Sequence, residues 1–181
     1  MNRKSRTVAL FILLLSLASA SCTETKTPRQ ESTQTTQQEV REEEIPDAYA
    51  FSVNGTVLYP DMDITTLPQE LGEPDGMFEE ESCAALGTAR LYAWHDYEIF
   101  TYPDGERDRI QYIYLKTDAV QTAEGADLAS TRSEIEALYG PGGEGSDETK
   151  LVYPRGSMCL VFAFDADGYP ASIEYRSDVM K

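Results

Sequence analysis

One histidine and three cysteines are the side chains of this 181-residue chain best suited to act as a base, a nucleophile or a metal ligand. A catalytic thiolate needs a proton acceptor close by, so Cys83 with His95 is the pair that could support a thiol-dependent enzyme. The chain has no Gly-x-Ser-x-Gly motif, and no third residue is evident that would orient the pair. The sequence therefore predicts a protein that is not an enzyme, with no catalytic residue and no cofactor. A secreted thiol-dependent enzyme is the less favoured alternative.

Acidic residues could bind calcium where they lie close together, as Asp165 and Asp167 do just before Gly168. An EF-hand loop needs a third ligand before its glycine and a glutamate at its twelfth position, a spacing that this segment lacks. Strand-like runs on both sides instead predict a hairpin turn. We therefore expect no metal site.

The overall charge restricts the class of partner. The chain holds 32 acidic and 15 basic residues, a net charge of −17. Such a chain repels nucleic acid, so we expect no nucleic-acid partner. Hydrophobic residues make up 41% of the sequence and include 11 tyrosines, enough for a packed core in one domain or in two small units.

The first 22 residues have the order of an export signal. Three basic residues precede an apolar run at 8–15, which is too short to span a membrane, and small residues at 18–21 lead to Cys22. This order resembles a bacterial lipobox. The resemblance implies that residues 1–21 are a signal peptide and that Cys22 carries a lipid anchor, which holds the protein on the outer face of the cell membrane. Cleavage after an Ala-x-Ala pattern at 18–20 would instead give a soluble secreted protein.

Residues 22–46 are predicted to form the lipidated N-terminus and a disordered linker. They are rich in Thr, Gln and Glu and contain no aromatic residue, so they cannot bury a core. A flexible linker of this length spans roughly 25 Å, which would hold a folded domain away from a membrane surface.

The remainder of the chain has the pattern of one motif written twice. Residues 65–74 and 131–141 each show a helix N-cap, a short apolar spacing, and then Gly and Pro as a stop. Extended stretches at 51–58 and 120–125 precede the two helices. Strand-like runs follow them at 89–94, 97–102, 109–115, 150–153, 158–164 and 171–176. The predicted fold class is therefore α+β, with two related helix-plus-antiparallel-sheet repeats, 47–115 and 116–181, packed as one unit.

This pattern of a capped helix, Leu-Tyr-Gly-Pro at 138–141 and antiparallel strands resembles the tandem repeat of beta-lactamase inhibitory protein. It is also similar to small outer-membrane assembly lipoproteins and to lipoproteins of Gram-positive anaerobes. The resemblance covers residues 47–181. It implies the helix-plus-sheet fold and a tendency to bind proteins, and it assigns no binding residue.

Cys83 and Cys159 are the pair available for a disulfide if Cys22 is lipidated and the compartment is oxidising. The bond would close a loop of about 75 residues and stabilise the fold by roughly 4 to 5 kcal/mol. Cys159 lies in an apolar strand-like run, so a buried thiol is the alternative.

Strand alternation predicts a surface rich in tyrosine. It places Tyr97, Ile99, Tyr112 and Tyr114 on one sheet face, opposite a core face with Phe100, Tyr102, Ile113 and Leu115. Tyrosine offers contact area together with a hydrogen bond, so the first four residues are candidate binding residues unless another part of the chain covers them.

Taken together, the sequence predicts a cell-surface lipoprotein that acts as a non-catalytic binding module, with an inhibitory module as one form of this function. Its partner would be an unidentified protein or small ligand. A structural subunit of an envelope assembly is the second function that the sequence allows.

Overall fold

The computed structural model describes residues 47–81 and 87–178, all within one compact unit, Glu42–Lys181. These residues are mostly strand. The elements in chain order are β1 (Phe51–Val53), β2 (Thr56–Leu58), the 3-10 turn η1 (Gln69–Leu71), β3 (Gly76–Glu81), β4 (Thr88–Ala93), β5 (Tyr97–Asp104), β6 (Arg107–Leu115), α1 (Arg132–Tyr139), β7 (Lys150–Arg155), β8 (Met158–Phe164) and β9 (Pro170–Ser177).

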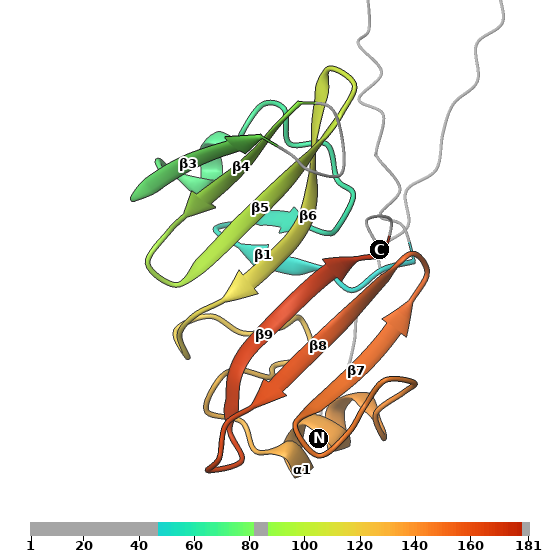
Figure 1. Ribbon diagram of the computed structural model, residues 1–181. Helices are drawn as coiled ribbons and strands as arrows, with labels where there is room; N and C mark the ends of the chain where they lie inside the picture. Colours follow the sequence, from blue (N-terminus) through green and yellow to red (C-terminus); the bar gives the residue numbers. More distant parts are fainter. Residues whose placement is uncertain (1–46, 82–86, 179–181) are drawn as a thin grey trace, which may run out of the picture. The chain divides into compact units, whose positions relative to one another are not determined.

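Seven strands form one antiparallel sheet in the order β3-β4-β5-β6-β9-β8-β7, and β1 pairs with β2 in a separate hairpin (Figure 1). Strands β3 to β6 pair in chain order, and so do β7 to β9. Residues 112–115 of β6 then pair with residues 173–176 of β9. The sheet is therefore continuous across the boundary that the sequence placed at 115/116.

The predicted fold class of two α+β repeats is wrong. Strands account for 46% of the described residues and helices for only 9%, with a single α-helix. The helix expected in 65–74 is only the three-residue turn η1, because Pro68 at its N-cap supplies no side-chain hydrogen bond and Gly72 follows at once. The extended stretch expected at 120–125 forms no strand.

The strand-like runs in the sequence predicted the observed elements more accurately than the helix signals did. The six runs predicted after the two helix signals correspond to β4 through β9. Helix α1 is also confirmed, together with its capping box, in which Thr131 and Glu134 satisfy each other's backbone N–H groups.

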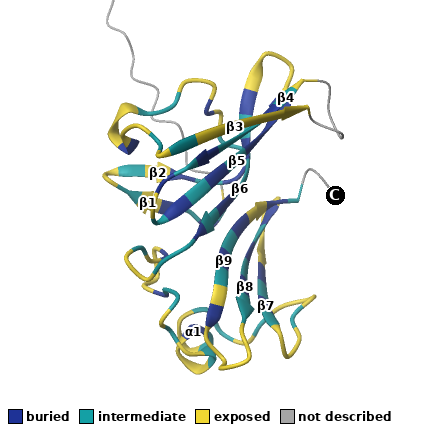
Figure 2. Cartoon of the chain, turned by 60° about the vertical axis from the view of Figure 1, so that its left-hand side comes forward, coloured by how far each residue is buried: buried dark blue, intermediate teal, exposed yellow. Residues whose placement is uncertain are grey.

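One face of the sheet carries the core. The cross-strand register aligns a row of buried side chains on this face, namely Tyr92, Ile99, Ile113, Tyr175, Leu160 and Tyr153. Strands β1 and β2 and helix α1 lie on the same side of the sheet (Figure 2). The ring of Phe51 lies 5.3 Å from that of Tyr97, and the ring of Tyr139 lies 5.5 Å from that of Phe162. Each such buried side chain contributes roughly 1.5–3 kcal/mol to folding.

A short extended segment, residues 61–64, takes the place of β9 beside the beginning of β6. Asp61 N donates to Ile110 O at 2.8 Å, and Ile64 N donates to Asp108 O at 2.8 Å. β6 therefore has two successive neighbours on the same edge, first this segment and then β9.

Asp61 connects three parts of the sheet at this junction. Its backbone has φ of 67°, in the left-handed region that asparagine and aspartate tolerate better than most residues. Its carboxylate accepts hydrogen bonds from Tyr102 Oη at 3.0 Å and from Ser177 Oγ at 2.6 Å. Asp61 thus ties β5 and the end of β9 to the segment that pairs with β6.

The predicted signal peptide (1–21), Cys22 and the predicted linker (22–46) lie outside the described residues, as does Cys83. In the described part of the chain, no helix is both long enough and apolar enough to cross a membrane.

Candidate functional site

The sheet face opposite the core carries one cross-strand row that spans all seven strands. Directly opposed residues of antiparallel strands point to the same side, so the register alone defines the row. We call this side of the sheet the open face. Its central row consists of Phe78 (β3), Leu91 (β4), Phe100 (β5), Tyr112 (β6), Arg176 (β9), Cys159 (β8) and Pro154 (β7).

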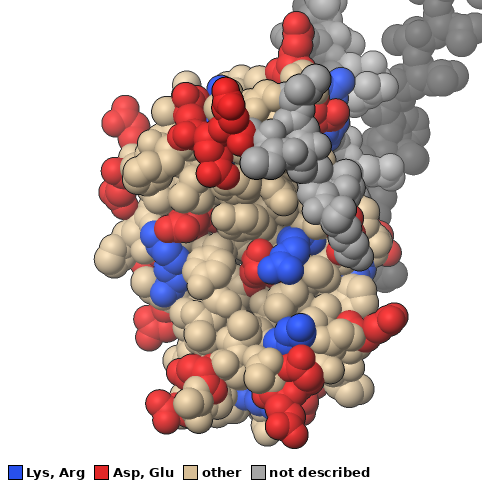
Figure 3. All heavy atoms as spheres, viewed as in Figure 1, with Lys and Arg blue, Asp and Glu red and all other residues tan. Residues whose placement is uncertain are grey.

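The open face is less buried than the core face and is largely neutral at its centre. Phe78 exposes 64% of its surface, and Leu91, Phe100 and Tyr112 are half-buried. Figure 3 shows neutral side chains over much of this face, a few basic side chains near its middle, and most of the acidic side chains around its margins. A face of this kind offers apolar contact area without being closed off by the described elements.

Aromatic stacking organises the middle of the row. The rings of Phe100 and Tyr112 are stacked, with centroids 5.0 Å apart and planes 14° from parallel. Burial, followed by the nearby carboxylates of Glu174, Glu98 and Glu80, raises the pKa of Tyr112. Tyr112 therefore stays neutral at physiological pH and can donate a hydrogen bond from its hydroxyl group.

An ion pair lies beside Tyr112. The guanidinium of Arg176 binds the carboxylate of Glu174 through two contacts, Nε to Oε1 at 3.0 Å and Nη2 to Oε2 at 2.5 Å. The hydrogen bond to Glu174 raises the pKa of Arg176 despite the opposing effect of partial burial. The Arg176 side chain is still 52% exposed, so part of its donor surface is available to a ligand.

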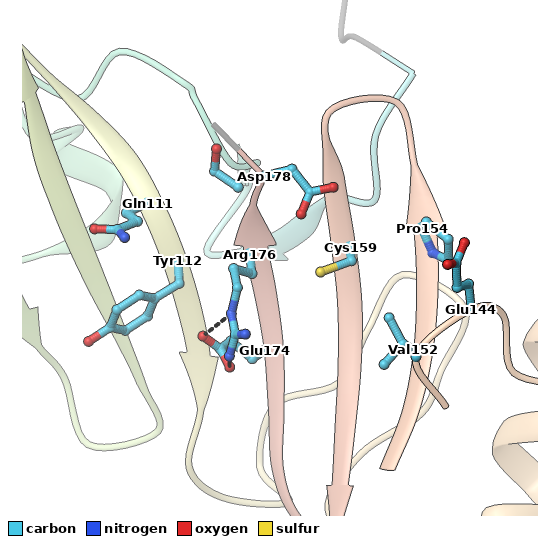
Figure 4. A pocket seen from close by; sticks show the side chains of 11 residues that line it. Gln111, Tyr112, Glu144, Val152, Pro154, Cys159, Glu174, Arg176 and Asp178 are labelled. Carbon is cyan, nitrogen blue, oxygen red and sulfur yellow. Dashed lines mark hydrogen bonds and ion pairs between the residues drawn. The ribbon is translucent and has the colours of Figure 1, made fainter. Parts of the chain in front are cut away.

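These side chains border a groove of about 820 Å³ over β6, β9, β8 and β7 (Figure 4). Its far wall is the loop before β7, which is held in place by Gly143 N donating to Val152 O at 2.8 Å. The groove is lined by Gln111, Tyr112, Glu144, Gly145, Val152, Pro154, Cys159, Glu174, Arg176, Ser177 and Asp178.

The structure separates the four candidate binding residues. Tyr112 and Tyr114 lie on the open face, but Tyr97 and Ile99 are 4% and 0% exposed and belong to the core. The prediction that all four share one exposed face is therefore wrong, because Tyr97 is paired with Leu115 and Ile99 with Ile113. Phe100, which was expected in the core, is on the open face instead.

One residue in the sequence signals the correct faces. Glu98 lies between Tyr97 and Ile99, and a charged residue in the middle of a strand normally faces away from the core. The same alternation places Phe100 with Glu98 and therefore on the open face. Phe78 gave no such signal, because the glutamate-rich run that follows it did not predict a strand.

The remaining residues considered for chemistry lie apart from one another or outside the described chain. His95 is in the turn between β4 and β5, with its side chain 86% exposed. Cys159 is half-buried at the groove, and the predicted disulfide to Cys83 cannot be traced because Cys83 is outside the described residues. Within 47–81 and 87–178, no group of three or more His, Cys, Asp or Glu side chains could hold a metal ion. The open face thus presents apolar, aromatic and ion-paired groups, an arrangement suited to binding.

Comparisons of the chain with models of protein families, with curated proteins and with solved structures gave no match.

Proposed function

We propose that this chain is an exported, lipid-anchored and non-catalytic module that binds a partner protein on the open face of its sheet. The observation that carries the proposal is the central row, in which apolar and aromatic side chains from Phe78 to Tyr112 continue into the groove beside Arg176. Such a surface supplies both the apolar area and the hydrogen-bonding groups that protein interfaces use.

The extent of the row favours a protein over a small ligand. Seven strands spaced about 4.8 Å apart give a row roughly 29 Å long, comparable to one side of a standard protein interface. Small ligands are usually enclosed by their pockets, whereas this surface is open along its length.

The overall charge of the chain favours a basic partner, whereas the charges on the open face itself are balanced. Glu80, Glu98 and Glu174 lie on this face together with Lys116, Lys150 and Arg176. The net charge of −17 adds a long-range attraction for basic proteins. We therefore expect binding to weaken as the salt concentration rises.

Site-specific photo-crosslinking tests the binding proposal. A photoreactive phenylalanine analogue at Tyr112, in cells that express the full chain, should form a discrete protein adduct. Tyr169 is a matched control, because it is an exposed tyrosine in the turn between β8 and β9. Equal adducts at both positions, or none at Tyr112, would contradict a binding role for the open face.

The anchoring part of the proposal rests on the sequence around Cys22 and has its own test. Wild-type chain should fractionate with membranes and show the mass of an acylated N-terminal cysteine, whereas Cys22→Ser should prevent acylation. Recovery of unacylated wild-type chain from the medium would contradict the lipid anchor.

A further inference from the structure

The two edges of the seven-stranded sheet differ in whether other described residues cover their backbone groups. At the β7 edge, the preceding loop satisfies the backbone of Val152, whose N–H donates to Ser146 Oγ at 2.9 Å while its carbonyl oxygen accepts from Gly143 N. Pro154 removes a further donor from this strand. The β7 edge is therefore closed to an additional strand.

The β3 edge has no comparable cover among the described residues. Strand β3 is outermost in the sheet, and within 47–81 and 87–178 its ladder runs only to β4 (Figure 1). Met77 and Phe78 on this strand are 54% and 64% exposed, the two highest values among the large apolar side chains described. An open strand edge with exposed apolar side chains is the arrangement to which an extended peptide adds.

Charge defines what could occupy this edge. Glu79 is paired with Arg90, with Oε1 and Nε 2.8 Å apart, and Arg90 also forms an ion pair with Asp108. Glu80 and Glu81 have no basic partner within 4.0 Å among the described residues. The edge thus offers two apolar positions, one neutralised position and then two unneutralised carboxylates, in chain order.

We propose that the partner binds by adding an extended segment to β3 as an eighth strand, and this inference rests on the proposed function. The segment would carry two basic residues, one neutral residue and two apolar residues in sequence. In antiparallel pairing the basic residues face Glu81 and Glu80, and the apolar residues face Phe78 and Met77. Because Phe78 and Glu80 also belong to the open face, the added strand would extend that face by one strand.

Self-pairing of two β3 strands fits the charges less well. In full antiparallel overlap it would set Glu79, Glu80 and Glu81 opposite Phe78, Met77 and Gly76. The carboxylates would then face apolar or absent side chains, with no basic residue of the second strand to pair with them. The occupant that the charges favour is therefore a basic segment of another protein.

The first test uses a capped, fluorescently labelled peptide, Thr-Lys-Lys-Thr-Val-Val-Thr, with the full chain, and measures Kd by fluorescence anisotropy. Two further versions carry N-methyl groups at alternate positions, either odd or even. Strand addition uses the N–H groups of one peptide edge only, so one version should lose binding and the other should retain it. Equal binding by both versions, or no binding by the unmodified peptide, would overturn the inference.

The second test exchanges the charges. The double variant Glu80→Lys/Glu81→Lys should bind the peptide at least tenfold more weakly, and a peptide with Glu-Glu in place of Lys-Lys should recover affinity for it. Asp118→Lys/Asp167→Lys is the matched control, because it changes the net charge equally at exposed positions away from β3. Equal weakening in the control variant would show that the loss of affinity comes from the change in net charge, and would overturn the inference.

Two outcomes separate this inference from the proposed function. A Tyr112 adduct that persists while the peptide fails to bind would overturn strand addition alone and leave the open face as the binding surface. A concentration-dependent dimer of the wild-type chain that is lost in a Met77→Lys/Phe78→Lys variant would show that a second copy occupies the edge, and would overturn the assignment to another protein.

Discussion

Removal of the Asp61 carboxylate should destabilise the fold substantially. Asp61→Ala eliminates the acceptor for the hydroxyl groups of Tyr102 and Ser177, which belong to residues only 7% and 4% exposed. Hydrogen bonds to a charged acceptor contribute roughly 1.5–3 kcal/mol each, so their loss costs about 3 kcal/mol or more. Alanine at a positive φ adds about 1 kcal/mol.

Asp61→Gly separates the two contributions. It removes the same hydrogen bonds but accepts the positive φ without strain, so it should be about 1 kcal/mol more stable than Asp61→Ala. Urea unfolding monitored by the fluorescence of Trp94, the single tryptophan, gives the free energy of unfolding for each variant. An Asp61→Ala protein within 1 kcal/mol of wild type would refute the role of the carboxylate. Equal stability of the alanine and glycine variants would refute the backbone argument.

Two further predictions concern the buried tyrosines. The hydroxyl groups of Tyr97 and Tyr175 have no hydrogen-bond partner among the described residues, so Tyr97→Phe and Tyr175→Phe should not lower the free energy of unfolding. Tyr153→Phe is the control and should cost about 1 kcal/mol, because Tyr153 Oη donates to Gly140 O at 2.9 Å. Burial also raises the pKa of Tyr97 and of Tyr102 to about 12 from an ordinary value of 10.0. Their stabilising contribution is therefore complete below pH 10 and is lost as the pH rises through 12, which urea titrations followed by far-UV circular dichroism would detect as falling stability above pH 10. Constant stability between pH 9 and 12 would contradict the pH argument.

The sequence predicted strands more reliably than it predicted their faces. Runs of β-branched and aromatic residues with clear turns between them located β4 to β9. Tyrosine occurs on both faces of β5 and β6, and Phe100 on the open face is as apolar as Ile99 on the core face, so hydrophobicity alone could not assign the core side. A register shift between Phe100 and Thr101 further disrupts simple alternation along this hairpin.

Strand β3 was not predicted because tertiary pairing, not local sequence preference, makes it extended. β3 includes the run Glu79–Glu81, and glutamate has a low strand propensity. This segment is nevertheless extended, because its backbone pairs with β4 and Arg90 neutralises Glu79. The predicted repeat of two helices was wrong for a related reason. Pro68 and Gly72 leave room for a single 3-10 turn, whereas Thr131 and Gly140 enclose the eight-residue helix α1.

The pairing of β6 with β9 also bears on how the chain folds. Every other pairing in the seven-stranded sheet joins strands adjacent in the chain, whereas Leu115 and Ile173 meet across a long connection that contains α1. Hairpins close quickly because their loops are short, while a distant pairing carries a larger entropic cost before it gains any contact. We therefore expect the β6–β9 seam to be the slow step of folding. Two preformed hairpin series would meet there, and the rate of folding would depend on the length of the connection between them.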